Sequence, residues 1–166
     1  MGSGTYAHED LAAPLGRVLA GLPVHLLTGG GRGVMASVSK AFVETYPRRG
    51  LSLGVLPSDD EMALPTPPVG YPNPYVEIPI RTHLPRKAPP DAPLHTRNVI
   101  NVLTADIIVF LPGSEGTRDE LSHARLWGTP CILYLRDPQD LNLPAGTPIC
   151  RRLDQVEAAL MDHFNL

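Results

Sequence analysis

Two short turns rich in glycine and hydroxyl side chains carry the residues best suited to bind an anion. The first is Thr28-Gly29-Gly30-Gly31-Arg32-Gly33, and the second is Pro112-Gly113-Ser114-Glu115-Gly116-Thr117. Each turn follows a short apolar run and precedes a helical pattern, so unpaired backbone N–H groups gather at the positive end of a helix. Such a site favours phosphate. Turns at the carboxyl ends of parallel strands face one crevice, so we predict that both bind one phosphorylated small molecule.

A guanidinium and a carboxylate flank the apolar run that leads into the second turn. Arg97 opens the helical pattern before this run, and Glu120 lies in the first turn of the helical pattern after it. Arg97 would bind phosphate in a bidentate manner, and Glu120 would act as a base or stabilise a cation at a ribosyl bond. A plain salt bridge between them, or a helix-dipole role for Glu120, is an equally open interpretation. Likewise, Ser114 would bind phosphate or cap a helix, and Arg32 would clamp an anion or remain a surface charge.

Several other functions are disfavoured by the sequence. The glycine turn lacks the Lys-Ser or Lys-Thr of a P-loop and the spacing of a dinucleotide fingerprint. The net charge of -3 and the pI of about 6.0 argue against a general nucleic-acid binder. No apolar run approaches the roughly 18 residues of a membrane span. The six histidines show no metal-ligand spacing, so we assign no metal. Two cysteines form no disulfide framework, and we expect a cytoplasmic protein.

Apolar periodicity places the turns in an alternating pattern of strands and helices. The sequence predicts strands at 24–27, 51–56, 75–80, 107–111 and 131–135, and helices at 9–20, from 34 onwards, and at 94–103, 115–127 and 153–163. This alternation is typical of an α/β fold with a doubly wound, mostly parallel sheet and helices on both faces. Pro79 predicts that 75–80 is an edge strand. The Pro-rich stretch 58–73 is too long for an ordinary connection and indicates a binding loop, a lid or an oligomer contact.

The chain starts on a further turn of the same type. Gly2-Ser3-Gly4-Thr5 resembles a strand-to-helix turn, but no strand precedes it. We therefore predict one domain over residues 1–166 whose first strand is missing or truncated. A cloning remnant at the first four residues is the alternative interpretation.

The two turns resemble a known pair of signatures. The stretches TGGGRGVM and LPGSEGTRDE resemble GGG-x-G-(V/L)-M and PGG-x-GT-x-x-E, which mark a Rossmann-like superfamily often labelled lysine decarboxylase-like. One branch holds cytokinin-activating nucleoside 5'-monophosphate phosphoribohydrolases, and another holds molybdenum cofactor carrier proteins. The stretch GYPNPYVEIPIRTHLP resembles the carrier branch. Arg97 and Glu120 match the catalytic positions of the hydrolases, but Asn98 replaces their lysine and Ser114 replaces a glycine.

The resemblance implies a carrier or storage protein that binds molybdenum cofactor through the phosphate of its molybdopterin and protects it. The resemblance implies that such a protein is not an enzyme, forms a homodimer or homotetramer, and delivers the cofactor to a molybdoenzyme acceptor. The cofactor-binding residues implied are Gly2, Ser3, Gly4, Thr28, Gly29, Gly30, Gly31, Arg32, Gly33, Val34, Met35, Arg97, Pro112, Gly113, Ser114, Glu115, Gly116, Thr117 and Glu120. A phosphoribohydrolase that uses Arg97 and Glu120 is the alternative, and a nucleotide-sensing module is a third hypothesis.

Overall fold

The computed structural model describes residues 1–59 and 66–166, and it contains helices and strands in the predicted order. Residues 60–65 of the predicted Pro-rich loop lie outside the described part. The strands are β1 (Leu26–Thr28), β2 (Ser52–Leu56), β3 (Ile78–Arg81), β4 (Ile108–Phe110) and β5 (Cys131–Leu133). The helices are α1 (Glu9–Gly21), α2 (Val34–Glu44), α3 (Arg97–Thr104), α4 (Glu115–Trp127) and α5 (Leu153–Phe164), with a short 3-10 helix at Pro138–Leu141.

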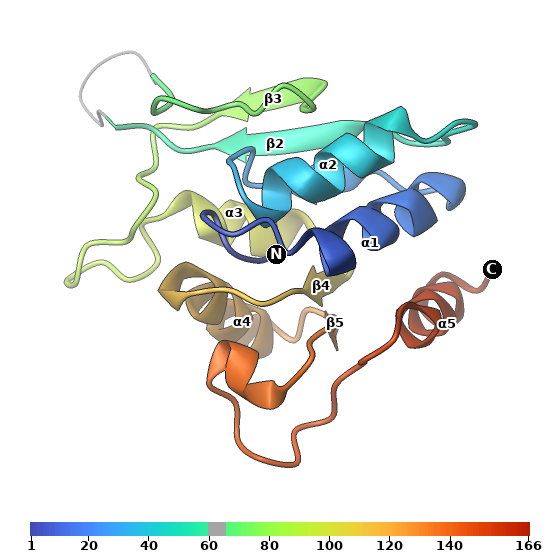
Figure 1. Ribbon diagram of the computed structural model, residues 1–166. Coiled ribbons are helices and arrows are strands. Elements are labelled where there is room, and N and C mark those ends of the chain that lie inside the picture. The colour runs from blue at the N-terminus through green and yellow to red at the C-terminus, as the bar shows by residue number, and fades with distance from the viewer. Residues whose placement is uncertain (60–65) are drawn as a thin grey trace.

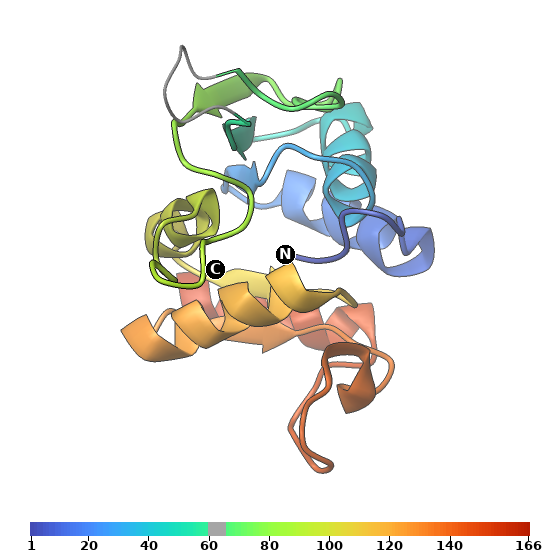
Figure 2. The same ribbon diagram turned by 90° about the vertical axis from the view of Figure 1, so that its left-hand side faces the viewer.

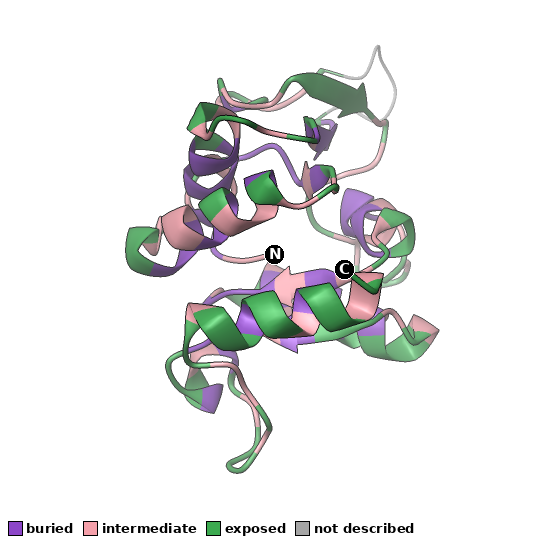
Figure 3. Cartoon of the chain, turned by 90° about the vertical axis from the view of Figure 1, so that its right-hand side faces the viewer, coloured by how far each residue is buried: buried purple, intermediate pink, exposed green. Residues whose placement is uncertain are grey.

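The strands confirm the predicted α/β class and its parallel pairing. They form two sheets, one with the order β1-β2-β3 and one with β4-β5, and every pair is parallel (Figure 1). As Pro79 predicts, β3 is an edge strand, and it is exposed along its whole length (Figure 3). The division into two sheets differs from the single sheet that the sequence predicts.

Helices cover both faces of the strands, which divides the core in two (Figure 2). One cluster joins α1, α2 and α5 to β1, with Leu15, Phe42 and Leu160 among its buried side chains. The other joins α3 and α4 to β4, with Val102 and Phe110 in its centre. Within the described residues, no helix is long and apolar enough to cross a membrane. The helices therefore act as packing layers that fix the turns at the strand ends.

Several element boundaries differ from the prediction, and two of them do so because polar side chains hold the chain out of regular structure. α3 begins at Arg97 rather than at 94, since the extended residue Thr96 caps it and its hydroxyl accepts a hydrogen bond from Asn98 N at 3.4 Å. β3 begins at Ile78 rather than at 75, because Asn73 Oδ1 accepts from Tyr75 N at 3.0 Å in a turn.

The first three residues run beside β4. Met1 donates from its amine to the Val109 carbonyl and accepts at its own carbonyl from Leu111 N at 2.8 Å. Ser3 N then donates to the Pro112 carbonyl at 3.0 Å. The two bonds of Met1 follow the pattern of a parallel ladder, whereas Ser3 bonds one residue further along than such a ladder would require. Residues 1–3 therefore lie extended alongside β4, and they lead into the Gly2–Thr5 turn at the predicted crevice.

Candidate anion-binding site

A cavity of about 360 Å³ lies where the two predicted turns meet. The first turn contributes Thr28 and Gly29 to its lining, and the second contributes Ser114, Gly116 and Thr117. The turn at residues 2–5 closes a further side through Gly2 and Gly4. The structure thus brings together the strand ends that the sequence placed at one crevice.

The glycine turn is held from behind by the described part of the Pro-rich loop. Asn73 donates from its backbone N to the Gly30 carbonyl at 2.7 Å and from its side-chain amide to the Gly31 carbonyl at 2.8 Å. The Thr28 hydroxyl accepts from Gly30 N at 3.1 Å. Gly30 and Gly33 have φ values of 71° and 62°, which favour glycine. Among the described residues, the N–H groups of Gly29 and Gly31 find no acceptor, and that of Gly29, which lines the cavity, is available to an anion.

The second turn leaves the N-terminus of α4 open. Ser114 occupies the N-cap position, but its side chain makes no capping bond, so the capping interpretation of this residue is wrong. Within the described part of the chain, no acceptor is found for the Ser114 and Gly116 N–H groups, whereas Thr117 N donates to the Ser114 carbonyl at 3.1 Å. Thr117 is buried against Gly113, where an added Cβ would come 2.2 Å from its Oγ1. Open amides at a helix start attract negative charge.

Ser3 connects the two turns. Its N–H donates to Pro112 at the second turn, and its carbonyl accepts from Val34 N, at the start of α2, at 2.9 Å. The Ser3 hydroxyl accepts from Thr5 N at 3.2 Å and from Tyr6 N at 2.9 Å. Ser3 is therefore a structural link whose polar groups are engaged within the protein.

Arg97 and Glu120 are both buried in the wall of the cavity, with 4% and 7% of their surface exposed. None of the ion pairs among the described residues joins them, so the plain salt bridge is not formed. The Arg97 guanidinium lies against Gly29, and its Nε has no hydrogen-bond partner among the described residues. An unpaired buried guanidinium is costly unless it meets an anion.

The burial of Glu120 changes its acidity. Desolvation raises the pKa of this carboxyl group, and the nearby Arg97 charge and a hydrogen bond from Asn101 oppose that rise. Glu120 is thus held closer to neutrality than an exposed glutamate. Its position beside an anion pocket is then less repulsive than the sequence suggests.

Some of the predicted site residues line the cavity, and others lie outside its lining. Those that line the cavity are Gly2, Gly4, Thr28, Gly29, Val34, Met35, Arg97, Ser114, Gly116, Thr117 and Glu120. Those outside its lining are Ser3, Gly30, Gly31, Arg32, Gly33, Pro112, Gly113 and Glu115. Arg32 is exposed and lies beside Gly70, where an added Cβ would come 2.7 Å from its Nε. Glu115 points to Lys87, with 2.9 Å between Oε2 and Nζ.

Eight lining residues escaped the sequence analysis, namely Met1, Thr5, Leu27, Val38, Tyr71, Arg86, Lys87 and Asn98. Tyr71 comes from the Pro-rich loop, Arg86 and Lys87 from the irregular stretch before α3, and Asn98 from the first turn of α3. The basic pair was a usable signal, because it lies in a stretch rich in positive charge, but no periodicity fixes where an irregular stretch runs.

Within the described residues, no group of three or more His, Cys, Asp or Glu side chains is suited to hold a metal ion.

Comparison with known proteins decides the family. Residues 1–156 match the model of the SLOG cluster4 family. The chain belongs to the SLOG cluster4 family. A search of curated proteins found no match.

Three solved structures resemble this SLOG cluster4 chain. The molybdenum cofactor carrier protein of Chlamydomonas reinhardtii is 26% identical with a TM-score of 0.72, over 100% of this chain and 94% of that one. The molybdenum cofactor binding protein of Rippkaea orientalis is 27% identical with a TM-score of 0.62, over 96% and 78%. The protein TM1055 is 29% identical with a TM-score of 0.60, over 75% of this chain and only 61% of that one. The predicted resemblance to this superfamily and its carrier proteins is confirmed.

Proposed function

We propose that this protein binds molybdenum cofactor through the phosphate of its molybdopterin and acts as a carrier or storage protein that protects it. The observation that carries the proposal is Arg97, which is buried, has an unpartnered Nε and lies against Gly29 at the cavity. A guanidinium binds phosphate in a bidentate manner and keeps its charge at all relevant pH values. The similarity to the Chlamydomonas molybdenum cofactor carrier protein and to the Rippkaea molybdenum cofactor binding protein supports this ligand over other phosphate esters.

The cavity suits a ligand of this kind in size and charge. Its volume of about 360 Å³ falls in the range of small-molecule sites. Free N–H groups at Gly29, Ser114 and Gly116 offer hydrogen bonds to phosphate oxygens. Arg86 and Lys87 are exposed at the same cavity, so they attract an anion towards the buried Arg97. The pterin and its dithiolene would then occupy the rest of the cavity, away from solvent.

The proposal includes an oligomeric state, an acceptor protein and a cellular location. We propose a homodimer or homotetramer, because Leu103 and Leu126 are exposed by 60% and 67% on α3 and α4, two helices that pack together. A molybdoenzyme that accepts the cofactor, and a cytoplasmic location, complete the proposed role. Light scattering of the purified protein, with Leu103→Glu as the disrupting variant, tests the assembly.

The direct test mixes the protein with molybdenum cofactor released from a molybdoenzyme and follows air oxidation of the cofactor. Wild-type protein is expected to slow the oxidation in proportion to its concentration. Arg97→Met is expected to lose most of this protection, since charge-assisted hydrogen bonds contribute about 1.5–3 kcal/mol each. Arg32→Gln, which changes an exposed arginine outside the cavity, is the matched control. Equal oxidation with and without saturating wild-type protein would remove the proposal.

A phosphoribohydrolase of nucleoside monophosphates is the second candidate, because Arg97 and Glu120 both line the cavity. In that reaction Glu120 would stabilise the ribosyl cation or activate water, and Arg97 would hold the phosphate. A panel of nucleoside 5'-monophosphates incubated with the protein tests it by release of free base. Release that Glu120→Gln abolishes would support the hydrolase, and binding without release would favour the carrier.

A further inference from the structure

The cavity at the two turns combines polar and apolar lining from different elements. Buried polar side chains of α3 and α4 line it, namely Arg97, Asn98, Thr117 and Glu120. Apolar side chains of α2 and the Pro-rich loop also line it, namely Val34, Met35, Val38 and Tyr71. A ligand that fills this cavity therefore meets charge in one part and an apolar surface in another.

Tyr71 and Met35 meet above the glycine turn. A Cβ added to Gly31 would lie 2.7 Å from Tyr71 Oη and 2.8 Å from Met35 Cε, so both side chains cover the same Cα atom. A methionine side chain packs favourably against an aromatic ring, and the two therefore form one continuous surface. Tyr71 is half-buried, and its hydroxyl makes no hydrogen bond with the part of the chain that the structure describes. Part of its ring is thus accessible from the cavity.

Backbone hydrogen bonds hold Tyr71 in position. Its N–H donates to the Pro68 carbonyl at 3.0 Å in a turn. Two residues later, Asn73 donates to the Gly30 carbonyl at 2.7 Å and to the Gly31 carbonyl at 2.8 Å, which fixes the loop to the glycine turn. An aromatic side chain on a fixed backbone has few bonds left to immobilise, so it binds a flat partner at a low cost in entropy.

The surface made by Tyr71 and Met35 lies next to the proposed phosphate site. Arg97 lies against Gly29, which is two residues before Gly31. The Cα atoms of these two glycines are therefore at most about 7 Å apart. A phosphate bound at Gly29 can thus be esterified to a group that rests on Tyr71.

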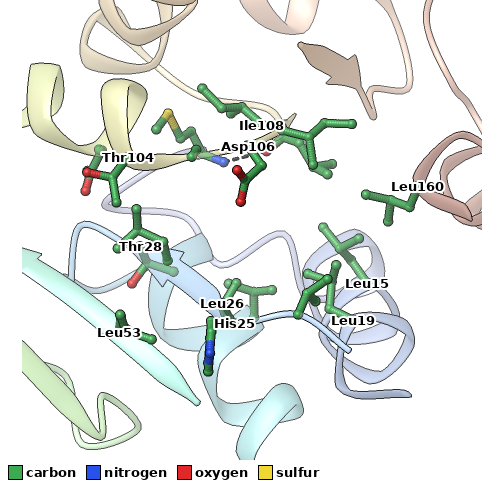
Figure 4. Close-up of a pocket in the computed structure, with 18 of the residues that line it drawn as sticks. Leu15, Leu19, His25, Leu26, Thr28, Leu53, Thr104, Asp106, Ile108 and Leu160 are labelled. Carbon is green, nitrogen blue, oxygen red and sulfur yellow. Dashed lines mark hydrogen bonds between the residues drawn. The ribbon is translucent and has the colours of Figure 1, made fainter. Parts of the chain in front are cut away.

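A second cavity, of about 380 Å³ between β1 and β4, is the alternative place for an apolar part of the ligand (Figure 4). It adjoins the first cavity, because Leu27, Thr28, Val34 and Val38 line both. Its lining includes the aliphatic side chains of Leu15, Leu19, Leu26, Leu53, Ile108 and Leu160 (Figure 4). Aliphatic groups lack the π face on which a flat ring stacks, so Tyr71 is the better partner for such a ring.

We propose that Tyr71, supported by Met35, binds the face of a planar heteroaromatic ring, so that the cavity selects phosphate monoesters of flat heterocycles over those of aliphatic alcohols. This inference rests on the proposed phosphate binding at Arg97 and assigns the specificity of the same site. The ring stacks on Tyr71 while its phosphate meets the Arg97 guanidinium and the open N–H group of Gly29. An aliphatic monoester makes the same phosphate contacts without the ring contact.

Two phosphate monoesters separate the ring contact from the phosphate contacts. The aromatic probe is the phosphate ester of 6-hydroxymethylpterin, the aliphatic probe is glycerol 3-phosphate, and calorimetry with the full chain measures both affinities. The wild type is expected to bind the pterin ester at least about tenfold more tightly, which is a typical effect of stacking. Tyr71→Leu is expected to lose this advantage and to bind glycerol 3-phosphate as the wild type does. Tyr71→Phe keeps the ring and is expected to retain the preference.

Tyr46→Leu is the matched control, because it removes an exposed tyrosine that lies outside the lining of the cavity. Unchanged affinity of Tyr71→Leu for the pterin ester would overturn the proposal, since the ring would then lie elsewhere. An equal loss for both esters would also overturn it, because Tyr71 would then only support the turns. Equal wild-type affinity for the two esters would remove the selectivity, and binding of neither would remove the phosphate site as well.

Failure of this inference and failure of the carrier role give different results. A protein that selects the pterin ester through Tyr71 but does not slow the oxidation of molybdenum cofactor keeps the ring site and loses the carrier role. A protein that slows this oxidation equally well with Tyr71→Leu, and whose Tyr71→Leu variant binds the pterin ester like the wild type, keeps the carrier role and loses the ring site.

Discussion

The guanidinium group of Arg97 lies directly against the backbone of Gly29. A Cβ added to Gly29 would come 1.8 Å from Nη1 and 2.4 Å from Cζ of Arg97. The first residue of the glycine run is therefore needed for the approach of a charged side chain, and not only for the turn itself. This contact joins β1 to the start of α3, two elements far apart in the sequence, at one wall of the cavity.

Gly29→Ala is expected to displace Arg97 and to weaken phosphate binding by at least about tenfold, which corresponds to about 1.4 kcal/mol. Calorimetry with inorganic phosphate measures the affinity. Gly21→Ala is the matched control, because an added Cβ there meets nothing within 4 Å and lies far from the site. Unchanged affinity in Gly29→Ala with a folded protein would mean that Arg97 does not contact the anion.

Asn73→Ala is expected to destabilise the protein by about 1–3 kcal/mol, because the buried Gly31 carbonyl loses its donor. Asn73→Asp keeps the acceptor for Tyr75 N but also removes the donor to Gly31, so it separates the two bonds. Urea denaturation gives the free energy of unfolding. If both variants are as stable as the wild type, the glycine turn does not depend on this clamp.

Glu120→Gln is expected to gain stability over the wild type as the pH rises. Burial raises the folded-state pKa of Glu120 above its ordinary value of 4.5. Because the pKa is raised in the folded state, the protonated Glu120 contributes to the free energy of unfolding. This contribution is fully present below the ordinary pKa of about 4.5 and is lost as the pH rises through the folded-state pKa. Glutamine does not titrate, so it avoids this loss. Urea midpoints of the two proteins are measured from acidic to neutral pH. Midpoints that change in parallel would mean that Glu120 is not buried as described.

Glu115→Gln is expected to tighten phosphate binding about two- to fivefold at low salt, because a carboxylate near the N-terminus of α4 is removed and Lys87 is released. Both side chains are mostly exposed, so stability should change little. Lys87→Gln is expected to weaken binding under the same conditions. Calorimetry at several salt concentrations checks both variants, and an effect that persists at 1 M salt would contradict an electrostatic cause.

The periodic parts of the fold could be predicted from the sequence. The continuous apolar run at Ile107–Leu111 correctly predicted β4, because a strand covered on both faces is apolar throughout. The apolar stripe that begins at Val34 correctly predicted α2, because this helix buries one face. Gly29 and Gly116 could be placed at one cavity because parallel strands end on one side. The side chains of Tyr71 and Arg86 could not be placed at the cavity from the sequence, since tertiary contacts rather than local periodicity determine the course of long irregular segments.

The sequence pattern also assigned to the site some residues that do not line the cavity. Arg32 and Glu115 are adjacent to residues that line the cavity, yet their side chains point to Gly70 and Lys87. Side-chain direction at a turn depends on backbone angles such as the positive φ of Gly33, which the sequence does not specify. The division of the strands into two sheets depends on pairing across the whole molecule, and the single-domain assignment of residues 1–166 stays a prediction.

The double attachment of Ser3, to Pro112 on one side and to Val34 on the other, has a mechanical consequence. Ser3 acts as a fixed spacer between two groups of N–H donors, so neither group can move without pulling on the other. Ligands whose negative oxygens match that spacing gain both sets of hydrogen bonds at once, whereas longer or shorter ones reach only one. If the cavity binds phosphate compounds as proposed, the backbone at residue 3 would set discrimination among them together with the side chains around the cavity.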